Sequence, residues 1–370
     1  MANIFSTIFG GGSSSGESAL GIDIGSSSIK VVQLTKKGGK AILETYGSLA
    51  LGTYGGQEVG RVMNLKTEEL SKATLDLLKE ASTTTHLTGM AIPSSSSLVF
   101  TITLPGILSE EQLKSIVPNE ARKYIPVPIT EVSLDWSLIP QQAKADQPDN
   151  RMQVVDDVEQ KTDVLVVAIH NETVARYKEV LEKTELETAF FEMEVFSAIR
   201  STFSREFAPV ILLDMGASKT KLSIVEYGIV RVFHIINRGS QDITLNISQS
   251  LSIPFAEAEL RKRNVGLEEN LDKQVAGIVK LSMDYILTEA NTVVLAYEKK
   301  YNKAISKVIL CGGGARTLGF LKYATISFNR EVAYGNPFSK TEAPAFLSPV
   351  LETSGPEFAI ALGLALRQIS

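Results

Sequence analysis

The sequence predicts an α/β protein whose two similar lobes face each other across a cleft. The segment ALGIDIGSSSIKVVQL at residues 19–34 is echoed by ILLDMGASKTKLSIV at residues 211–225. In each copy, two apolar runs flank an acid, a glycine and small hydroxyl side chains, a pattern typical of two strands joined by a tight turn. The copies lie about half a chain apart, and 370 residues are too many for one compact core. A strand–turn–strand unit at the start of each of two duplicated lobes explains both observations.

The two turns carry residue types suited to phosphate and magnesium. Glycine permits close approach, serine hydroxyls and backbone N–H groups donate to phosphate oxygens, and lysine adds positive charge. An aspartate repels phosphate but can hold Mg²⁺ through water. Either turn alone is equally explained as an ordinary hairpin turn, so the repeat in register carries the argument. Aligned on the acids, the corresponding residues are Asp23 and Asp214, Gly25 and Gly216, Ser27 and Ser218, and Lys30 and Lys221.

Two later segments add to this pattern. KVILCGGGARTLGFLKY, residues 307–323, predicts a buried strand, three glycines and then a helix. A flat ring or a sugar can lie against such a backbone, and the helix N-terminus favours anions. The segment lacks both the P-loop and the dinucleotide-binding spacing. In FAEAELRKRNVG, residues 255–266, Glu259 and Lys262 share one helix face, where in isolation a solvated ion pair is the simpler interpretation.

Composition excludes several classes of function. The net charge of −5 and the lack of a long basic block argue against a nucleic-acid partner. A single cysteine, Cys311, rules out an internal disulfide, and the three histidines lie far apart without metal-ligand spacing. No apolar run is long enough to span a membrane, and the start lacks the pattern of a signal peptide. We therefore expect a cytoplasmic location.

The first 18 residues predict a separate tail. Ile4, Phe5, Ile8 and Phe9 would share one face of a short helix, followed by a Gly/Ser linker. One interpretation is a small anchor for a membrane surface or a partner. The other is a frayed end, because so short a helix is unstable alone.

Together these segments resemble the actin/Hsp70/hexokinase superfamily and, within it, the PilM family of type IV pilus assembly, which is itself similar to FtsA. TITLPGILSEEQLKSIVPNEARKYIPVPITEVSLDW, residues 101–136, is the part specific to PilM, and AIALGLALR at residues 359–367 completes the pattern. The resemblance implies an actin-like ATPase fold: two duplicated RNase H-like lobes around a nucleotide cleft, with the inserted β/α subdomain that FtsA and PilM carry.

The resemblance also implies a division of the chain. The inserted subdomain is expected to hold strands over residues 99–104, 132–139 and 163–170, and a helix that starts at Ser109 with a capping box to Gln112. A kink or break is expected at Pro118, a mobile hairpin over residues 140–162, and further helices over residues 171–185 and 268–301. The expected parts are a tail (1–18), a first lobe (19–89 and 186–207, with a C-terminal helix over 355–370), the inserted subdomain (90–185), a second lobe (208–245 and 302–354) and its upper helical part (246–301).

Carried over residue by residue, the resemblance implies a site for ATP and Mg²⁺. Asp23 and Asp214 would face the metal. One loop would meet the β- and γ-phosphates, the glycine run would pack along the adenosine, and the Glu-x-x-Lys pair would lie at the ribose and base. Besides the two aspartates, the implied residues are Gly25, Ser26, Ser27, Lys30, Gly216, Ala217, Ser218, Gly239, Glu259, Lys262, Gly312, Gly313 and Gly314.

Hydrolysis is the open question. Glu194 matches the acid of the first connecting helix, which positions the attacking water in hydrolysing relatives, but it is equally explained as a solvated or ion-paired acid. That helix has no glutamine comparable to actin's, so weak or no ATPase activity is expected. Lys219 and Lys221 add charge that actin lacks, either to neutralise phosphates or as solvated side chains.

By resemblance, the protein would assemble under the inner membrane as a platform or ring, bind the N-terminal cytoplasmic peptide of PilN and link the membrane platform to the pilus motor ATPases. One alternative is a small-molecule kinase of the same superfamily, but no acid lies in a convincing sugar-binding segment. The other is an FtsA-like division anchor that forms filaments. Its C-terminal amphipathic helix is missing after ALRQIS, although an N-terminal anchor over residues 4–9 would favour it.

Overall fold

A computed structural model of the protein describes residues 18–139, 161–204, 206 and 208–369. The predicted tail, apart from Ser18, and most of the predicted hairpin over residues 140–162 lie outside the described residues. No helix in the described part of the chain is both long enough and apolar enough to cross a membrane.

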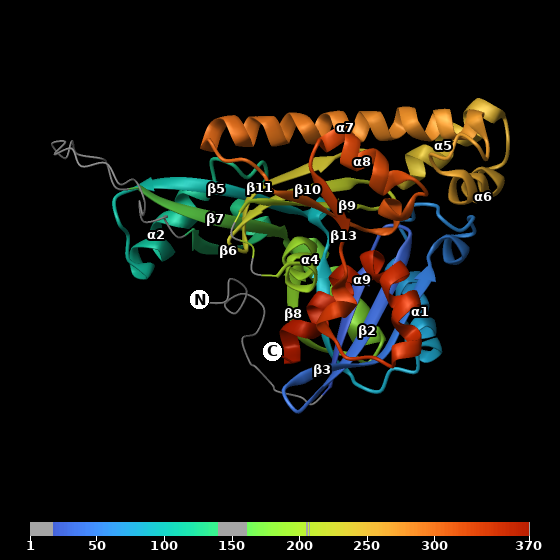
Figure 1. The fold of residues 1–370 in the computed structure, drawn as a ribbon. Helices are drawn as coiled ribbons and strands as arrows, with labels where there is room; N and C mark the ends of the chain where they lie inside the picture. The colour runs from blue at the N-terminus through green and yellow to red at the C-terminus, as the bar shows by residue number, and fades with distance from the viewer. Residues whose placement is uncertain (1–17, 140–160, 205, 207, 370) are drawn as a thin grey trace.

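Two five-stranded sheets share one topology, which confirms the predicted duplication (Figure 1). Their orders are β3-β2-β1-β4-β8 and β11-β10-β9-β12-β13. In each sheet the first three strands are antiparallel and the other pairings are parallel. The strands are β1 (Ser18–Ile24), β2 (Ser28–Lys37), β3 (Lys40–Ala50), β4 (Leu87–Ile92) and β8 (Glu187–Met193), then β9 (Val210–Met215), β10 (Thr220–Glu226), β11 (Ile229–Ile236), β12 (Lys307–Cys311) and β13 (Glu331–Tyr334).

Helices cover both faces of the first sheet, so its central strands are buried on both sides. Leu20 and Ile22 of β1 share a core with Leu77 of α1, whereas the alternate residue Ala19 packs with Phe358 of α9. A Cβ on Gly21 would lie 2.0 Å from the carbonyl oxygen of Ala361, so α9 rests directly on the backbone of β1. The helices of this lobe are α1 (Thr67–Glu80), α3 (Asn171–Lys183), α4 (Glu194–Thr202) and α9 (Ser348–Ile369).

The long helix α7 (Lys273–Tyr301) lies across the second sheet, at the top of Figure 1. It begins later than the predicted residue 268 because the Asp272 carboxylate accepts the N–H groups of Gln274 and Val275, which fixes the first turn. The other helices of this lobe are α5 (Ser240–Leu251), α6 (Phe255–Val265) and α8 (Phe320–Phe328). Short 3₁₀ turns span Gly52–Gly55, Ser94–Ser96, Ile129–Glu131, Gly313–Arg316, Pro337–Lys340 and Ala345–Leu347.

A third, antiparallel sheet lies between β4 and β8 in the sequence. It has the order β5-β7-β6, formed by β5 (Ser97–Pro105), β7 (Lys161–His170) and β6 (Val132–Ile139). One face is covered by α2 (Glu110–Ala121), and residues 165, 167 and 169 on the other face join the core of the first lobe. Strand β5 lies beside β11 of the second lobe (Figure 1).

Helix α2 confirms one prediction and corrects another. The capping box is present: the Ser109 hydroxyl accepts the N–H of Gln112, whose side chain accepts the N–H of Ser109. Of the kink or break predicted at Pro118, the break is excluded, because α2 continues to Ala121. Leu113 and Val117, on either side of the lost hydrogen bond, are buried against the sheet and hold the helix together.

Candidate functional site

A cleft of about 820 Å³ lies between the two lobes, within the size range of ligand pockets. Its walls contain every site residue predicted from the sequence except Gly239. The sequence signals therefore converge in space, although most of them are far apart in the chain.

The two predicted loops have the same geometry. The N–H of Gly25 donates to the carbonyl of Ser28 over 3.0 Å, and that of Gly216 donates to the carbonyl of Lys219 over 3.0 Å. A Cβ would lie 3.0 Å from the Ser28 oxygen in the first loop and 3.1 Å from the Lys219 oxygen in the second, so glycine suits both turns. Across each hairpin the acid faces a lysine: Asp23 opposite Lys30, and Asp214 opposite Lys221.

Asp23 is buried, with one oxygen available. Its Oδ2 lies 4.0 Å from the ammonium of Lys30, and its buried Oδ1 has no hydrogen-bond partner among the described residues. Burial raises the pKa of Asp23 to about 6, against the attraction of Lys30 and with added repulsion from Glu194 and Asp214. A buried carboxylate oxygen without a partner is unusual in a folded protein and favours a site for a cation at Asp23.

Lys221 lines the cleft and is paired with acids, so of the two interpretations made from the sequence the solvated side chain is excluded. Its ammonium lies 3.1 Å from Asp214 Oδ2 and 2.8 Å from Glu194 Oε2. Burial alone would lower the pKa of Lys221, but the two carboxylates outweigh it and raise the pKa well above its usual value. The signal was present in the sequence, since Lys221 repeats the position of Lys30 relative to its acid.

Glu194, the candidate acid, is the first residue of α4 and is buried. Besides Lys221, its Oε2 accepts the N–H of Ser94 over 2.9 Å and the Ser94 hydroxyl over 2.8 Å. Burial favours the neutral acid, yet Lys221 and the Ser94 donors prevail and hold the pKa of Glu194 below its usual value. This oxygen therefore has three donors and a firmly retained charge. Sequence reasoning missed Ser94, which follows β4 in a short serine run without a motif.

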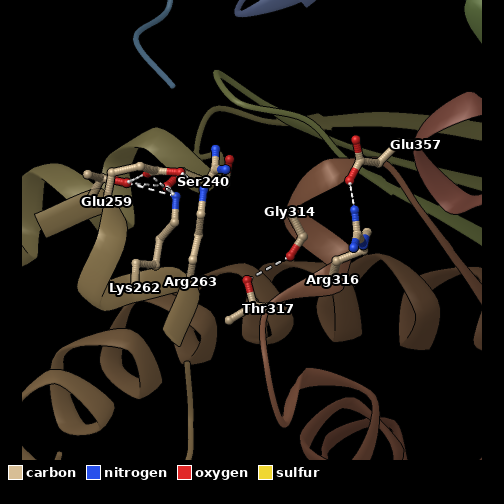
Figure 2. A network of polar contacts seen from close by, with 9 residues as sticks. Ser240, Glu259, Lys262, Arg263, Gly314, Arg316, Thr317 and Glu357 are labelled. Carbon is tan, nitrogen blue, oxygen red and sulfur yellow. Dashed lines mark hydrogen bonds and ion pairs between the residues drawn. The ribbon is translucent and has the colours of Figure 1, made fainter. Parts of the chain in front are cut away.

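Glu259 and Lys262 form a buried ion pair, so a solvated pair is excluded (Figure 2). Glu259 Oε2 accepts from Lys262 Nζ over 2.6 Å and from the Thr244 hydroxyl over 2.6 Å. Lys262 also donates to the carbonyl of Ser240 at the start of α5, over 3.0 Å. Arg263, which the sequence analysis did not single out, donates to Glu259 Oε1 over 2.7 Å and lines the cleft. The ion pair thus connects α6 to α5. Glu259 also holds the guanidinium of Arg263 at the wall of the cleft.

The three glycines of the run differ in the space around them. Gly312 has a φ of +82°, and a Cβ there would lie 2.5 Å from Asp214 Oδ1. At Gly314 a Cβ would lie 2.6 Å from the Met215 side chain. Close packing on β9 therefore requires these two glycines, without any ligand. Only at Gly313 is there room, since the nearest atom to a Cβ belongs to Glu357, 3.8 Å away.

The expected helix does not follow the glycines directly. A 3₁₀ turn, Gly313–Arg316, comes first, and α8 begins only at Phe320. The Thr317 hydroxyl closes this turn on the carbonyl of Gly314 over 2.8 Å, and Arg316 pairs with Glu357 of α9 (Figure 2). Hydrogen bonding within the turn ends the segment before an α-helix can form, so the N-terminus of α8 does not lie at the glycine run.

Gly239 lies behind the second loop and not in the wall of the cleft. A Cβ on Gly239 would lie 2.3 Å from the carbonyl oxygen of Ala217. The N–H groups of Ser240 and Gln241, at the start of α5, donate to the carbonyls of Gly216 and Ala217 over 3.0 and 2.9 Å. Gly239 therefore allows α5 to hold the loop in place.

The segment over residues 51–66 closes one side of the cleft and was not predicted. The N–H of Met63 donates to the carbonyl of Ser26 over 2.8 Å, next to the first loop. The N–H of Val62 donates to the side chain of Gln241, and the guanidinium of Arg61 lies 3.8 Å from the ring centre of Phe255. The first lobe thus reaches both α5 and α6 of the second.

Within the described residues, no group of three or more His, Cys, Asp or Glu side chains is arranged to hold a metal ion. A divalent ion would consequently need oxygen ligands from a bound molecule or from water in addition to the protein.

A duplicated α/β fold with paired turns across an interlobe cleft defines an actin-like protein, as predicted. Residues 21–369 match the family described as type IV pilus assembly protein PilM, and the chain belongs to that family. The comparisons give no support to the kinase or division-anchor alternatives.

Solved structures agree on the fold. A chain of the PilM–PilN type IV pilus biogenesis complex is 23% identical, with a TM-score of 0.79 over 96% of this chain and 99% of that one. The ethanolamine utilization protein EutJ from Carboxydothermus hydrogenoformans is 15% identical, with a TM-score of 0.53 over 94% and 89% of the two chains. MreB5 of Spiroplasma citri bound to ADP is 11% identical, with a TM-score of 0.50 over 94% of each chain.

Proposed function

We propose that this protein binds ATP with Mg²⁺ in the interlobe cleft and that the bound nucleotide holds the lobes in the form that docks the cytoplasmic N-terminal peptide of PilN. The observation that carries the proposal is the pair of equivalent turns, one from each lobe, in a single cleft of about 820 Å³. A ligand that bridges two lobes stabilises their closed arrangement by mass action, with no need for turnover.

The residues present fit the phosphate end of such a ligand. Ser26, Ser27 and Ser218 line the cleft beside glycines that keep the turns open, and Lys30 and Lys219 supply positive charge. The unpartnered, buried oxygen of Asp23 would suit Mg²⁺, which when bound would neutralise phosphate charge. Asp214, the other proposed metal residue, already faces Lys221.

At the other end of the cleft, Gly313 offers room for a flat ring, with Arg263 and Arg316 also in the wall. The Glu259–Lys262 pair would lie beside the ribose and base and keep α6 in position. These assignments rest on two features of the cleft wall. The open glycine backbone leaves space for a flat ring, and the positively charged side chains favour anionic groups of the ligand.

Slow or absent hydrolysis fits the state of Glu194. Glu194 Oε2 has three donors, and Lys221 and the Ser94 donors hold the pKa of Glu194 below its usual value, which makes the carboxylate a weak base toward an attacking water. We therefore propose that ATP acts as a structural ligand and that Glu194 is not an effective base.

The proposed partner surface lies on the inserted subdomain, expected over residues 90–185. Ile107 and Tyr124 flank α2 and leave 76% and 53% of their area exposed, unusual for large apolar side chains. Tyr124 stacks on Phe100 of β5, with ring centres 5.0 Å apart, which keeps it fixed for contact. The protein would work at the cytoplasmic face of the inner membrane, self-associate into a platform or ring and connect to the pilus motor ATPases.

Fluorescence anisotropy with a labelled N-terminal PilN peptide tests the proposal. ATP should tighten peptide binding and the peptide should tighten ATP binding by the same factor, because coupling between sites is reciprocal. Ile107→Asp should abolish peptide binding. Ile326→Asp on α8, where the native side chain is 69% exposed, is the matched control and should bind normally. If Ile107→Asp binds the peptide as tightly as Ile326→Asp does, the peptide docks elsewhere on the protein. If ATP does not change the affinity for the peptide, the nucleotide and peptide sites are not coupled.

A further inference from the structure

The third sheet, β5-β7-β6, is joined to the first lobe by two connections, and both line the interlobe cleft. The sheet is inserted between β4 and β8, so the chain enters it through the 3₁₀ turn over residues 94–96 and leaves it through α3. Residues 93–96 of the first connection lie in the wall of the cleft, as do Thr173, Arg176 and Tyr177 of the second. A change in the cleft can therefore reach the third sheet at its attachment points.

The second connection continues the sheet without a linker. Strand β7 ends at His170, and α3 begins at Asn171. Strand β7 is the central strand of the third sheet and pairs along its length with both β5 and β6. A shift of α3 would consequently be passed to the whole sheet through β7.

Arg176 joins α3 to the segment over residues 51–66. Its Nη2 donates to the carbonyl of Leu65, and its Nη1 lies 3.5 Å from Asn64 Oδ1. Leu65 is buried, whereas Arg176 is half-buried and faces the cleft. The planar guanidinium fork can hold both oxygens in one fixed geometry, which an ammonium cannot do.

The same segment is bonded to the first of the two paired turns. The N–H of Leu51 donates to the carbonyl of Ser27 over 2.9 Å, and the N–H of Met63 donates to the carbonyl of Ser26 over 2.8 Å. A ligand that orders this turn will therefore also order the segment. The chain of contacts then runs from the turn through Met63 and Leu65 to Arg176 and α3.

The third sheet also packs on the second lobe. Strand β5 lies beside β11, and Val99 of β5 packs against the same hydrophobic core as Ile229 and Phe233 of β11. The sheet thus touches both lobes, and its position depends on how the lobes are arranged around the cleft.

We propose that Arg176 is a positioning residue through which a nucleotide in the cleft controls the peptide-binding surface of the third sheet. The inference rests on the proposed function and adds its regulation. With ATP bound, the first turn and residues 51–66 are ordered, and Arg176 holds α3 and β7 in the arrangement that docks the peptide. Without Arg176, both ligands still bind, but neither affects the other.

The test measures the coupling factor, which is the ratio of the affinities for the labelled PilN peptide with and without saturating ATP. It should be at least about fivefold in the wild type. Arg176→Gln removes the charge and the fork, so its coupling factor should fall below about twofold. Its affinity for the peptide without ATP should stay within about threefold of the wild-type value. Arg176→Lys keeps the charge and loses the fork, so its coupling factor should lie between the two.

Lys183→Gln, on the same helix, is the matched control. Lys183 lies 3.2 Å from Glu68 of α1 and links the same two parts of the chain on the protein surface. A surface ion pair of this kind contributes little, so the variant should keep the wild-type coupling factor. An equal loss of coupling in Lys183→Gln and Arg176→Gln would overturn the inference.

Full coupling in a folded Arg176→Gln variant, or in Arg176→Lys if the first variant does not fold, would also overturn the inference. So would a wild type that binds both ligands without coupling. If the wild type binds no ATP, the proposed nucleotide site fails, and hydrogen exchange without ligands then tests the contact itself. Arg176→Gln should speed amide exchange at least about fivefold both in residues 61–66 and in α3, and unchanged exchange in either would overturn the inference.

Discussion

The guanidinium of Arg61 lies 3.8 Å from the ring centre of Phe255, and this contact joins the lid segment over residues 51–66 to α6 of the other lobe. The hydrogen bond from Val62 to Gln241 connects the same segment to α5, and Lys221 with Glu194 is a further contact between the lobes.

Arg61→Ala should weaken the attachment of the two lobes. A cation–π contact of this kind contributes about 0.5–2 kcal/mol, so ATP affinity should fall by roughly 2- to 30-fold as the closed population drops. Titration calorimetry measures the change. Arg61 also pairs with Glu58 over 3.2 Å, so Glu58→Gln, which removes that pair and keeps the stack, is the control. If both variants lose the same affinity, the stack with Phe255 is not the cause.

Substitutions in the glycine run should separate fold from binding. Gly312→Ala and Gly314→Ala place a Cβ within 2.5 and 2.6 Å of β9 atoms and should destabilise the protein by about 1–3 kcal/mol. In Gly313→Val the new Cβ lies in ordinary contact with Glu357, 3.8 Å away, so the variant should stay close to wild-type stability while losing at least about tenfold in ATP affinity. Urea unfolding and calorimetry give the two quantities. Normal ATP affinity in Gly313→Val would mean that the nucleotide does not lie on this backbone.

Asp135 should make stability depend on pH. It is buried in β6, where one oxygen accepts the N–H of Trp136 and the other has no hydrogen-bond partner. Burial raises its pKa from 3.8 to about 7, although the Trp136 N–H and the charge of Arg367 act in the opposite direction. The folded state therefore keeps a proton that the unfolded state releases, and stability falls as the pH rises from about 4 to about 7.

Asp135→Asn removes this cost. The variant should gain about 1 kcal/mol or more over the wild type at pH values above 7, a smaller amount near pH 5, and almost nothing near pH 3, where the acid is neutral in both the folded and the unfolded state. Thermal unfolding across this range measures both. An equal gain in stability at every pH would show that the pKa of Asp135 is the same in the folded and the unfolded protein.

Glu192 should be essential to the fold and not to the cleft. It is fully buried, with two hydrogen bonds from Arg200 at 2.6 and 2.7 Å and one from Arg367 at 2.9 Å. Glu192→Ala leaves these arginines without their buried partner and should cost about 3–5 kcal/mol in urea unfolding. Glu182→Ala, exposed on α3, should cost less than about 0.5 kcal/mol. A small loss of stability in Glu192→Ala would mean that water solvates the two arginines in place of the carboxylate.

The sequence predicted the duplicated sheets because each hairpin repeats an apolar–turn–apolar pattern that local chemistry determines. It also predicted the strands of the third sheet and the capping box at Ser109, which depend on nearby residues. The break at Pro118 failed because burial of Leu113 and Val117 overrides one lost hydrogen bond. The extra residues predicted for α7 failed because Asp272 caps the helix.

At the candidate site, the residues that line the cleft were easier to predict than whether each charged side chain is solvated or paired. The cleft collects nearly all of the predicted residues, but whether a lysine is solvated or buried depends on which distant acid it meets. Lys221 meets Glu194, and Ser94 meets the same oxygen, through contacts between segments far apart in sequence. Likewise, the reason for Gly312 and Gly314 lies in Met215 and Asp214 of another strand, which spacing within the glycine run cannot reveal.

The most direct measurement is a calorimetric titration of the purified protein with ATP in the presence of Mg²⁺, continued long enough to detect slow heat from hydrolysis. The account predicts a saturable heat near one nucleotide per chain, at least about tenfold weaker in affinity in Gly313→Val, with little or no later heat. A folded, nucleotide-free wild-type protein that gives no binding heat would contradict it, because the paired turns would then be scaffold and not a working cleft.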